Sequence, residues 1–166
     1  PAAYRGHLFG VEPLQGRGGE AECSKDGSSI RTRDVRHVLT TDDPWFRPVA
    51  IDVGPDGGIY VADFYEDRID HAAHFAGRVD TKSGRLYRVT RKRAPRVGRF
   101  DLRELSSRAL LALFSHANPW YRQTALRILA GRRDASTIPV LQRQLLGGEG
   151  GPGALNALWA LSQSTG

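Results

Sequence analysis

The stretch WFRPVAIDVGPDGGIYVAD, residues 45–63, decides the fold of the first half of this chain. Apolar side chains alternate with small or polar ones over residues 49–53 and again over residues 59–61, and this period of two places each set on one side of a strand. The sequence Gly54-Pro-Asp-Gly-Gly separates the two runs; its proline presets φ, and a glycine accepts the positive φ that ends a tight turn. The stretch therefore predicts two antiparallel strands joined by a hairpin turn.

Similar short runs, bounded by glycine, proline or aspartate, occur elsewhere in the first 94 residues. They predict further strands at residues 7–14, 20–24, 29–33 and 85–91. The last of these is expected to be an exposed edge strand, because charged residues recur along it. Such hairpins form the inner halves of β-propeller blades. Residues 1–94 are therefore expected to be antiparallel β-structure, made of incomplete β-propeller blades.

Apolar residues recur at helical spacing after about residue 95. Four helices are predicted, at residues 108–115, 119–131, 136–146 and 154–163. Ser106 or Ser107 can cap the first helix, Asn118 stands before a proline at the start of the second, and Gly131 is expected to end it. An Ala-Leu dipeptide recurs at equivalent places in the second and fourth helices, so residues 95–166 are expected to form an α-helical, HEAT-like solenoid.

The chain carries 24 Lys and Arg against 18 Asp and Glu, a net charge of +6, with the excess over residues 85–99. Such a cluster could neutralise the phosphates of nucleic acid, but Pro95 and Gly98 within it favour a solvated connection between two domains. Nucleic acid is therefore not expected as a partner. The single cysteine, Cys23, cannot form an internal disulfide, and no apolar run is long enough to cross a bilayer.

Several motifs resemble those of known families. The helical half resembles a short HEAT repeat in Asn118-Pro-Trp-Tyr-Arg-Gln-Thr-Ala-Leu, followed by Asp134-Ala-Ser-Thr-Ile-Pro-Val-Leu. The whole chain resembles the C-terminal propeller segment and HEAT repeats of the large membrane-bound dehydrogenase-like proteins of planctomycetes. This resemblance rests on the order of Tyr4-Arg-Gly, Asp43-Pro-Trp-Phe-Arg-Pro-Val, Gly54-Pro-Asp-Gly, Tyr60-Val-Ala-Asp-Phe-Tyr and Gly84-Arg-Leu-Tyr-Arg-Val. Those proteins are similar in turn to the quinoprotein glucose and sorbosone dehydrogenases.

The resemblance implies oxidation of a sugar or a related alcohol by a protein of the periplasm or cell envelope. It also implies pyrroloquinoline quinone, calcium and haem c as cofactors of a full-length parent. The chain starts at Pro1 and contains no methionine, which favours a segment of such a parent. Because the upstream blades and a Cys-x-x-Cys-His motif are missing from it, the segment is not expected to be a complete enzyme or to hold catalytic or metal-binding residues.

The resemblance assigns Arg47 to the quinone, because Arg47 falls where a loop arginine of those dehydrogenases contacts the cofactor. A guanidinium offers a planar fork of donors, although a contact that steadies the loop is the alternative role. The second arginine and the lysine of the family pattern are replaced by Trp45 and Gln15. Asp63 and Tyr65 end an inner strand at the expected channel mouth, where the aspartate could bind a cation or a substrate hydroxyl, or cap the following turn.

Two functional classes remain open at this point. One is part of a sugar or alcohol dehydrogenase, with a sugar-like small molecule as ligand. The other is a non-catalytic propeller and HEAT scaffold that binds protein partners through its helical surface. His71 and His74 lie three residues apart and suggest a metal site, but a polar loop is the favoured interpretation of that segment.

Overall fold

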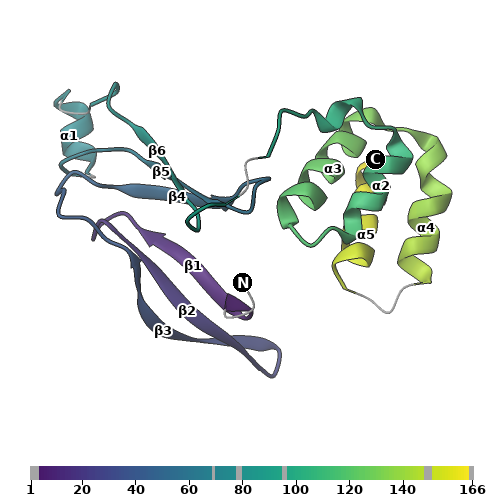
Figure 1. Cartoon of the computed structure of the whole chain (residues 1–166), viewed down its shortest axis with the longest axis horizontal. Helices are drawn as coiled ribbons and strands as arrows, with labels where there is room; N and C mark the ends of the chain where they lie inside the picture. The colour runs from purple at the N-terminus through teal and green to yellow at the C-terminus, as the bar shows by residue number, and fades with distance from the viewer. Residues whose placement is uncertain (1–3, 69, 78–79, 95–96, 148–150, 165–166) are drawn as a thin grey trace. The chain divides into compact units, whose positions relative to one another are not determined.

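The computed structural model describes residues 4–164 apart from 69, 78–79, 95–96 and 148–150 (Figure 1). The chain divides into two compact units, one of Pro1–Asp52 with Gly58–Arg91 and the other of Val53–Gly57 with Lys92–Gly166. The strands and the short helix before residue 92 are β1 (His7–Glu12), β2 (Arg17–Asp26), β3 (Ser29–Leu39), β4 (Pro48–Val53), β5 (Ile59–Asp63), α1 (His71–Phe75) and β6 (Arg85–Val89). The later elements are η2 (Leu102–Glu104), α2 (Ser107–Ala112), η3 (Leu113–Ser115), α3 (Pro119–Arg132), η4 (Ala135–Thr137), α4 (Ile138–Leu146) and α5 (Pro152–Ser164).

Strands β4, β5 and β6 form one antiparallel sheet in that order, which we call sheet 2. Partly buried and exposed residues alternate along β4, and Val61 and Asp63 are buried on β5. The turn closes with a hydrogen bond from Gly57 N to Gly54 O at 3.0 Å, and Gly57 has a φ of 72°. The predicted hairpin is therefore confirmed, and β6 is an edge strand with exposed arginines, as expected.

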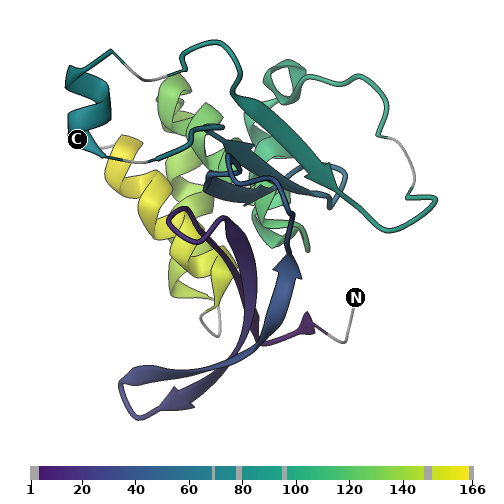
Figure 2. The ribbon, with the colours of Figure 1, turned by 90° about the vertical axis from the view of Figure 1, so that its left-hand side faces the viewer.

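Strands β1, β2 and β3 form a second antiparallel sheet, sheet 1, in the order β1-β2-β3. Figure 2 shows β2 and β3 as a long twisted ribbon. β3 was expected to end at residue 33 but continues to Leu39, and nearly all of its 11 residues are exposed. Periodicity does not reveal this extension, because a strand that is exposed on both faces has no apolar alternation to detect.

Gly16 occupies the turn between β1 and β2 and has a φ of 60°. A Cβ atom at this position would lie 2.9 Å from the carbonyl oxygen of Phe46, which belongs to the loop before β4. Both the left-handed backbone and the close approach therefore require glycine here. The contact brings the tip of the β1–β2 hairpin against the loop that carries Arg47.

The expectation of incomplete propeller blades over residues 1–94 is wrong. A blade is a four-stranded sheet, and blades repeat around a central channel. The described part of the chain contains two separate three-stranded sheets and no propeller. Alternation and turn residues identify antiparallel strands, but they carry no information on how many strands pair or whether sheets repeat around an axis. Residues 71–75, expected in a polar loop, form the short helix α1.

The four predicted helices are present after residue 100. Ser106 caps α2 by accepting a hydrogen bond from Ala109 N, and Asn118 caps α3 by accepting one from Trp120 N. Gly131 does not end α3: the helix continues to Arg132, and Arg133 adopts the left-handed conformation with a φ of 49°. The residue that ends a helix is commonly glycine, but here an arginine takes that role.

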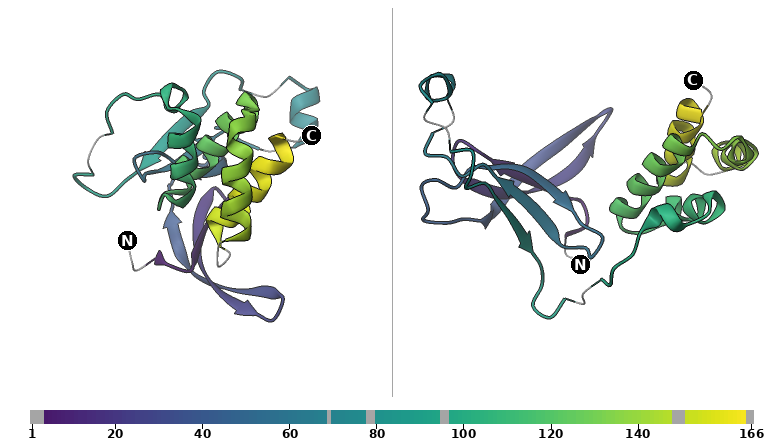
Figure 3. Two further views of the ribbon diagram at one scale, coloured as in Figure 1. Left: turned by 90° about the vertical axis from the view of Figure 1, so that its right-hand side faces the viewer. Right: turned by 90° about the horizontal axis from the view of Figure 1, so that it is seen from above.

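The helical elements pack around one shared core instead of stacking as a solenoid. Buried side chains come from η2, α2, η3, α3, α4 and α5: Leu102, Leu110, Leu111, Phe114, Ala125, Leu129, Leu141, Ala157 and Ala160. In a solenoid each repeat contacts only its neighbours. Here α5 contacts η3 and α3 as well as α4, so the elements close on themselves (Figure 3). The HEAT-like solenoid expected over residues 95–166 is therefore wrong, and the chain as a whole is of a mixed α and β class.

Asp101 is expected to make the helical unit sensitive to acid. The side-chain hydrogen bond from Arg103, followed by that from its backbone N–H, lowers the pKa of Asp101 from 3.8 to about 2. A lowered pKa means that the carboxylate contributes stability above pH ~4, and that this contribution is lost as the pH falls toward ~2. We expect the Asp101 carboxyl resonance to titrate near pH 2 in NMR, and D101N to lose less stability than wild type over that range. A midpoint at the ordinary value of 3.8 would contradict this prediction.

Candidate functional site

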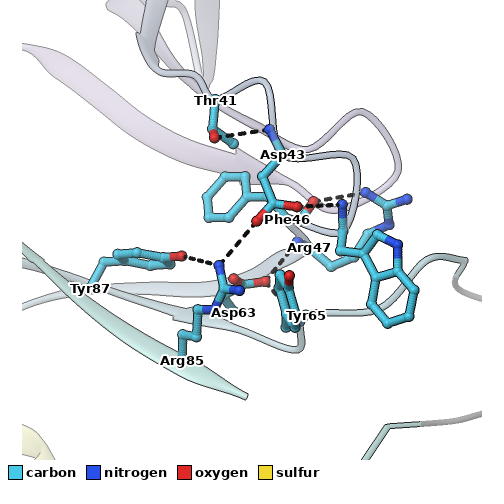
Figure 4. Close-up of polar contacts among 9 residues, drawn as sticks. Thr41, Asp43, Phe46, Arg47, Asp63, Tyr65, Arg85 and Tyr87 are labelled. Carbon is cyan, nitrogen blue, oxygen red and sulfur yellow. Dashed lines mark hydrogen bonds and ion pairs between the residues drawn. The ribbon is translucent and has the colours of Figure 1, made fainter. Parts of the chain in front are cut away.

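Asp63 is the centre of the polar cluster at the end of β5. The strand period turns this carboxylate inward, and the residue is only 3% exposed. Its Oδ1 accepts hydrogen bonds from Arg47 N at 2.7 Å and from Tyr65 N at 2.9 Å (Figure 4). Phe64 N donates to Arg47 O at 3.0 Å, so two hydrogen bonds join Arg47, just before β4, to the end of β5, while the bond from Tyr65 N fixes the turn that follows β5.

The second carboxylate oxygen of Asp63, Oδ2, is buried and has no hydrogen-bond partner among the described residues. Burying half of an ionised carboxylate in this way costs free energy. The capping alternative fits the hydrogen bond to Tyr65 N. A cation or a substrate hydroxyl would have to reach an atom that this structure screens from solvent.

Tyr65 has a φ of 56°, an uncommon conformation for a residue with a bulky side chain. Such strain persists only where the surroundings fix it, and it concentrates at functional sites. Here the Asp63 carboxylate fixes the backbone on one side. On the other side, the guanidinium carbon of Arg85 lies 3.4 Å from the centroid of the Tyr65 ring, a cation–π contact.

Arg85 begins β6 directly opposite Asp63 in the strand register. Its Nη1 donates to Tyr87 Oη at 3.0 Å and to Asp43 Oδ2 at 3.1 Å. These contacts, the Tyr87 hydrogen bond first, raise the pKa of Arg85 above its ordinary value, so the guanidinium is charged at every physiological pH. Asp43 is itself held in place, because its Oδ1 accepts a hydrogen bond from Trp45 N at 3.0 Å.

The outer part of this cluster is accessible. Trp45 is 39% exposed, and its ring lies 5.6 Å from that of Tyr65. The side chains of Arg85 and Asp43 are 38% and 31% exposed. We call Asp43, Trp45, Tyr65, Arg85 and Tyr87 the aromatic–arginine cluster. It combines an indole, two tyrosines and a fixed ion pair, and Figure 4 shows the side chains of Asp43, Tyr65 and Tyr87 around that of Arg85.

Arg47 lies beside the cluster but uses its guanidinium within the protein. Nη1 donates to Phe46 O at 2.8 Å, and Nη2 donates to Asp67 O. These bonds hold the loops before β4 and after β5, which is the loop-steadying role that the sequence left open. Gln15, at the place of the family's lysine, is exposed next to Gly16.

The structure brings Arg47, Asp63 and Tyr65 together, as a shared site requires, but no described propeller exists whose channel they could line. These residues do not fit a quinone as they stand. The guanidinium of Arg47 already donates to a backbone carbonyl, and the second carboxylate oxygen of Asp63 is buried. Sequence reasoning missed Asp43, Arg85 and Tyr87. The Asp43–Arg85 pair spans 42 residues, and no local pattern predicts it.

Groups of three or more His, Cys, Asp or Glu side chains that could hold a metal ion do not occur in the described ranges. None of the described helices has the length and apolar character needed to cross a membrane.

Comparison with known proteins bears on the sheet-containing part of the chain. No curated protein and no solved structure matches the sequence significantly. A family model described as a domain of unknown function, DUF7133, matches residues 1–93, which is more than half of the 166 residues. The match includes both sheets and every residue of the aromatic–arginine cluster. The chain therefore belongs to the DUF7133 family.

Proposed function

We propose that the aromatic–arginine cluster binds a small polyhydroxylated ligand, such as a sugar or a polyol. The observation that carries this proposal is the strained Tyr65, fixed between Asp63 and Arg85 beside the half-exposed Trp45. Aromatic rings offer apolar faces to the C–H groups of a sugar ring. The remaining N–H groups of Arg85 and the hydroxyl of Tyr87 can bond its hydroxyls.

This proposal keeps the sugar-like ligand that the dehydrogenase resemblance implies, but it does not require a propeller fold. Under the proposal, the described residues bind the ligand, and the redox chemistry belongs to a larger parent. Pyrroloquinoline quinone, calcium, haem c and a periplasmic or envelope location remain predictions from the resemblance alone.

Titration with D-glucose, followed by two-dimensional NMR of the full chain, tests the proposal. We expect saturable shifts of the Trp45 indole and Tyr65 amide signals, with a dissociation constant in the millimolar range. W45A should weaken binding about tenfold, because loss of one aromatic contact in a small site removes about 1–1.5 kcal/mol. R85K should weaken it less, since the charge remains but the planar fork is lost.

The matched control is W159A, because Trp159 is 46% exposed and lies on α5 in the helical unit. W159A should leave the affinity unchanged. Shifts that do not saturate, or equal weakening by W45A and W159A, would rule out a polyol site at this cluster.

A protein-binding scaffold is the second candidate function, and β3 is the observation that favours it. This edge strand is 11 residues long and exposed along nearly its whole length, so its outer backbone groups could pair with an extended segment of a partner. In the glucose titration, absence of any response at the cluster would favour this second function.

A further inference from the structure

Sheet 1 carries a basic cavity that the proposed function does not use. The cavity has a volume of about 370 Å³, and its lining includes Arg5, His7, Cys23, Arg31 and Arg33. Among the described residues that line it, only Glu22 has an acidic side chain. The cavity lies wholly within the first unit, at the end of the sheet where β1 begins.

Strand pairing places these side chains in a row. His7 of β1 lies opposite Glu22 of β2, and Glu22 lies opposite Arg33 of β3. Arg33 Nη2 donates to Glu22 Oε2 at 2.6 Å, and Arg31 Nη2 donates to Asp26 Oδ2 at 2.8 Å. The two carboxylates orient the guanidinium groups, while the arginine side chains remain 70% and 73% exposed.

A buried carboxylate, that of Glu20, orients the His7 ring. Its Nδ1 lies 2.7 Å from Glu20 Oε1, and the Glu20 side chain is only 2% exposed. The other oxygen of Glu20 accepts a hydrogen bond from Arg36 Nε at 2.7 Å. Because Nδ1 is engaged, Nε2 is the ring nitrogen that remains for a ligand.

Arg5 gives the cavity its excess charge. It is exposed and makes no side-chain hydrogen bond or ion pair with any other described residue. The cavity has three arginines, Arg5, Arg31 and Arg33. Two carboxylates neutralise two of them, Glu22 in the lining and Asp26 beside it, so one positive charge is not neutralised. By contrast, Arg17 is matched one to one by Glu12 at 2.8 Å, outside the residues that line this cavity.

We propose that this cavity binds the phosphate group of a small anionic molecule. Guanidinium forks match the tetrahedral phosphate oxygens in charge and geometry, and the cavity holds two oriented arginines and a third that is free to close on a ligand. Carboxylates on the neighbouring strand already orient Arg31 and Arg33, so these two side chains lose little further conformational entropy when a ligand binds. The proposal is independent of the polyol site, which is built on sheet 2.

Inorganic phosphate is the probe for this site. The full chain is titrated with phosphate at constant ionic strength, with chloride as the exchanged anion, and followed by two-dimensional NMR. We expect saturable shifts at the amides of Gly6, Cys23 and Ser24. R5Q and R33Q should each weaken binding about fivefold to tenfold, through loss of a charge-assisted hydrogen bond at a partly exposed site. R33K should bind with intermediate affinity.

The control variant R17Q removes an arginine of the same sheet outside the cavity lining, and it should bind phosphate as wild type does. All three substituted positions, 5, 17 and 33, are exposed or partly exposed, so the unaffected remainder of each spectrum reports that the fold is intact. The proposal is overturned if chloride alone produces the same shifts, or if R17Q weakens binding as much as R33Q.

Discussion

Replacing Gly16 with alanine is expected to lower the free energy of unfolding of the sheet-containing unit by about 3 kcal/mol, the sum of backbone strain and a steric clash. At a φ of 60°, alanine pays the cost of the left-handed conformation. Its Cβ would also lie 2.9 Å from the carbonyl oxygen of Phe46. The nearest atom belongs to the backbone, so relief requires the hairpin tip and the Arg47 loop to move apart.

Gly27 provides a matched control for the clash. It has nearly the same φ, 62°, but a Cβ there would meet no atom within 4 Å. G27A should therefore lower the free energy of unfolding by only about 1 kcal/mol, the cost of the left-handed backbone alone. Urea unfolding of the full chain, followed through the indole NMR signal of Trp45, separates this unit from the helical one. Equal losses in G16A and G27A would show that the contact with Phe46 does not contribute.

Removing the carboxylate of Asp63 is expected to cost about 3 kcal/mol, because D63A leaves the partly buried N–H groups of Arg47 and Tyr65 without their acceptor. The left-handed conformation of Tyr65 then loses the hydrogen bond that fixes it on one side. We therefore also expect D63A to abolish the shifts that glucose produces at Trp45. Urea unfolding and the glucose titration measure the two effects separately.

D63N is the informative companion of D63A. Its amide oxygen can still accept from Arg47 N and Tyr65 N, while the amide group replaces the buried oxygen Oδ2 that lacks a described partner. The loss of stability should therefore stay within about 1 kcal/mol, because a buried charge is removed along with its desolvation cost. If D63N is as unstable as D63A, the charge and not the acceptor geometry holds the loop.

Local features of the structure were predictable because their causes are local. The alternation of Val49, Ile51 and Val53 gives a strand, and Ser106 and Asn118 are found as helix caps. In each case the residue that produces the feature lies within a few positions of it in the sequence. The same holds for Asp63, whose capping of the following turn is a bond to the residue two positions on.

Tertiary arrangement was not predictable in the same way. The hairpin signals do not distinguish a three-stranded sheet from a four-stranded blade, and helical stripes do not distinguish a closed helical cluster from a solenoid. Glu20 falls in the strand predicted at residues 20–24, but no local pattern indicates that it is buried between His7 and Arg36, which lie 13 and 16 residues away. The contact of Arg85 with Tyr65 likewise depends on the pairing of β5 and β6.

The pairing of β2 with β3 shifts register twice, between Gly18 and Gly19 and between Glu20 and Ala21. Irregularities of this kind bend a strand and increase its twist, so the free side of β3 is a poor template for stacking identical chains into a fibre. A deletion that restored regular pairing would flatten the ribbon and remove this protection. The resulting protein would be expected to bind thioflavin T on storage, while the natural chain stays dispersed.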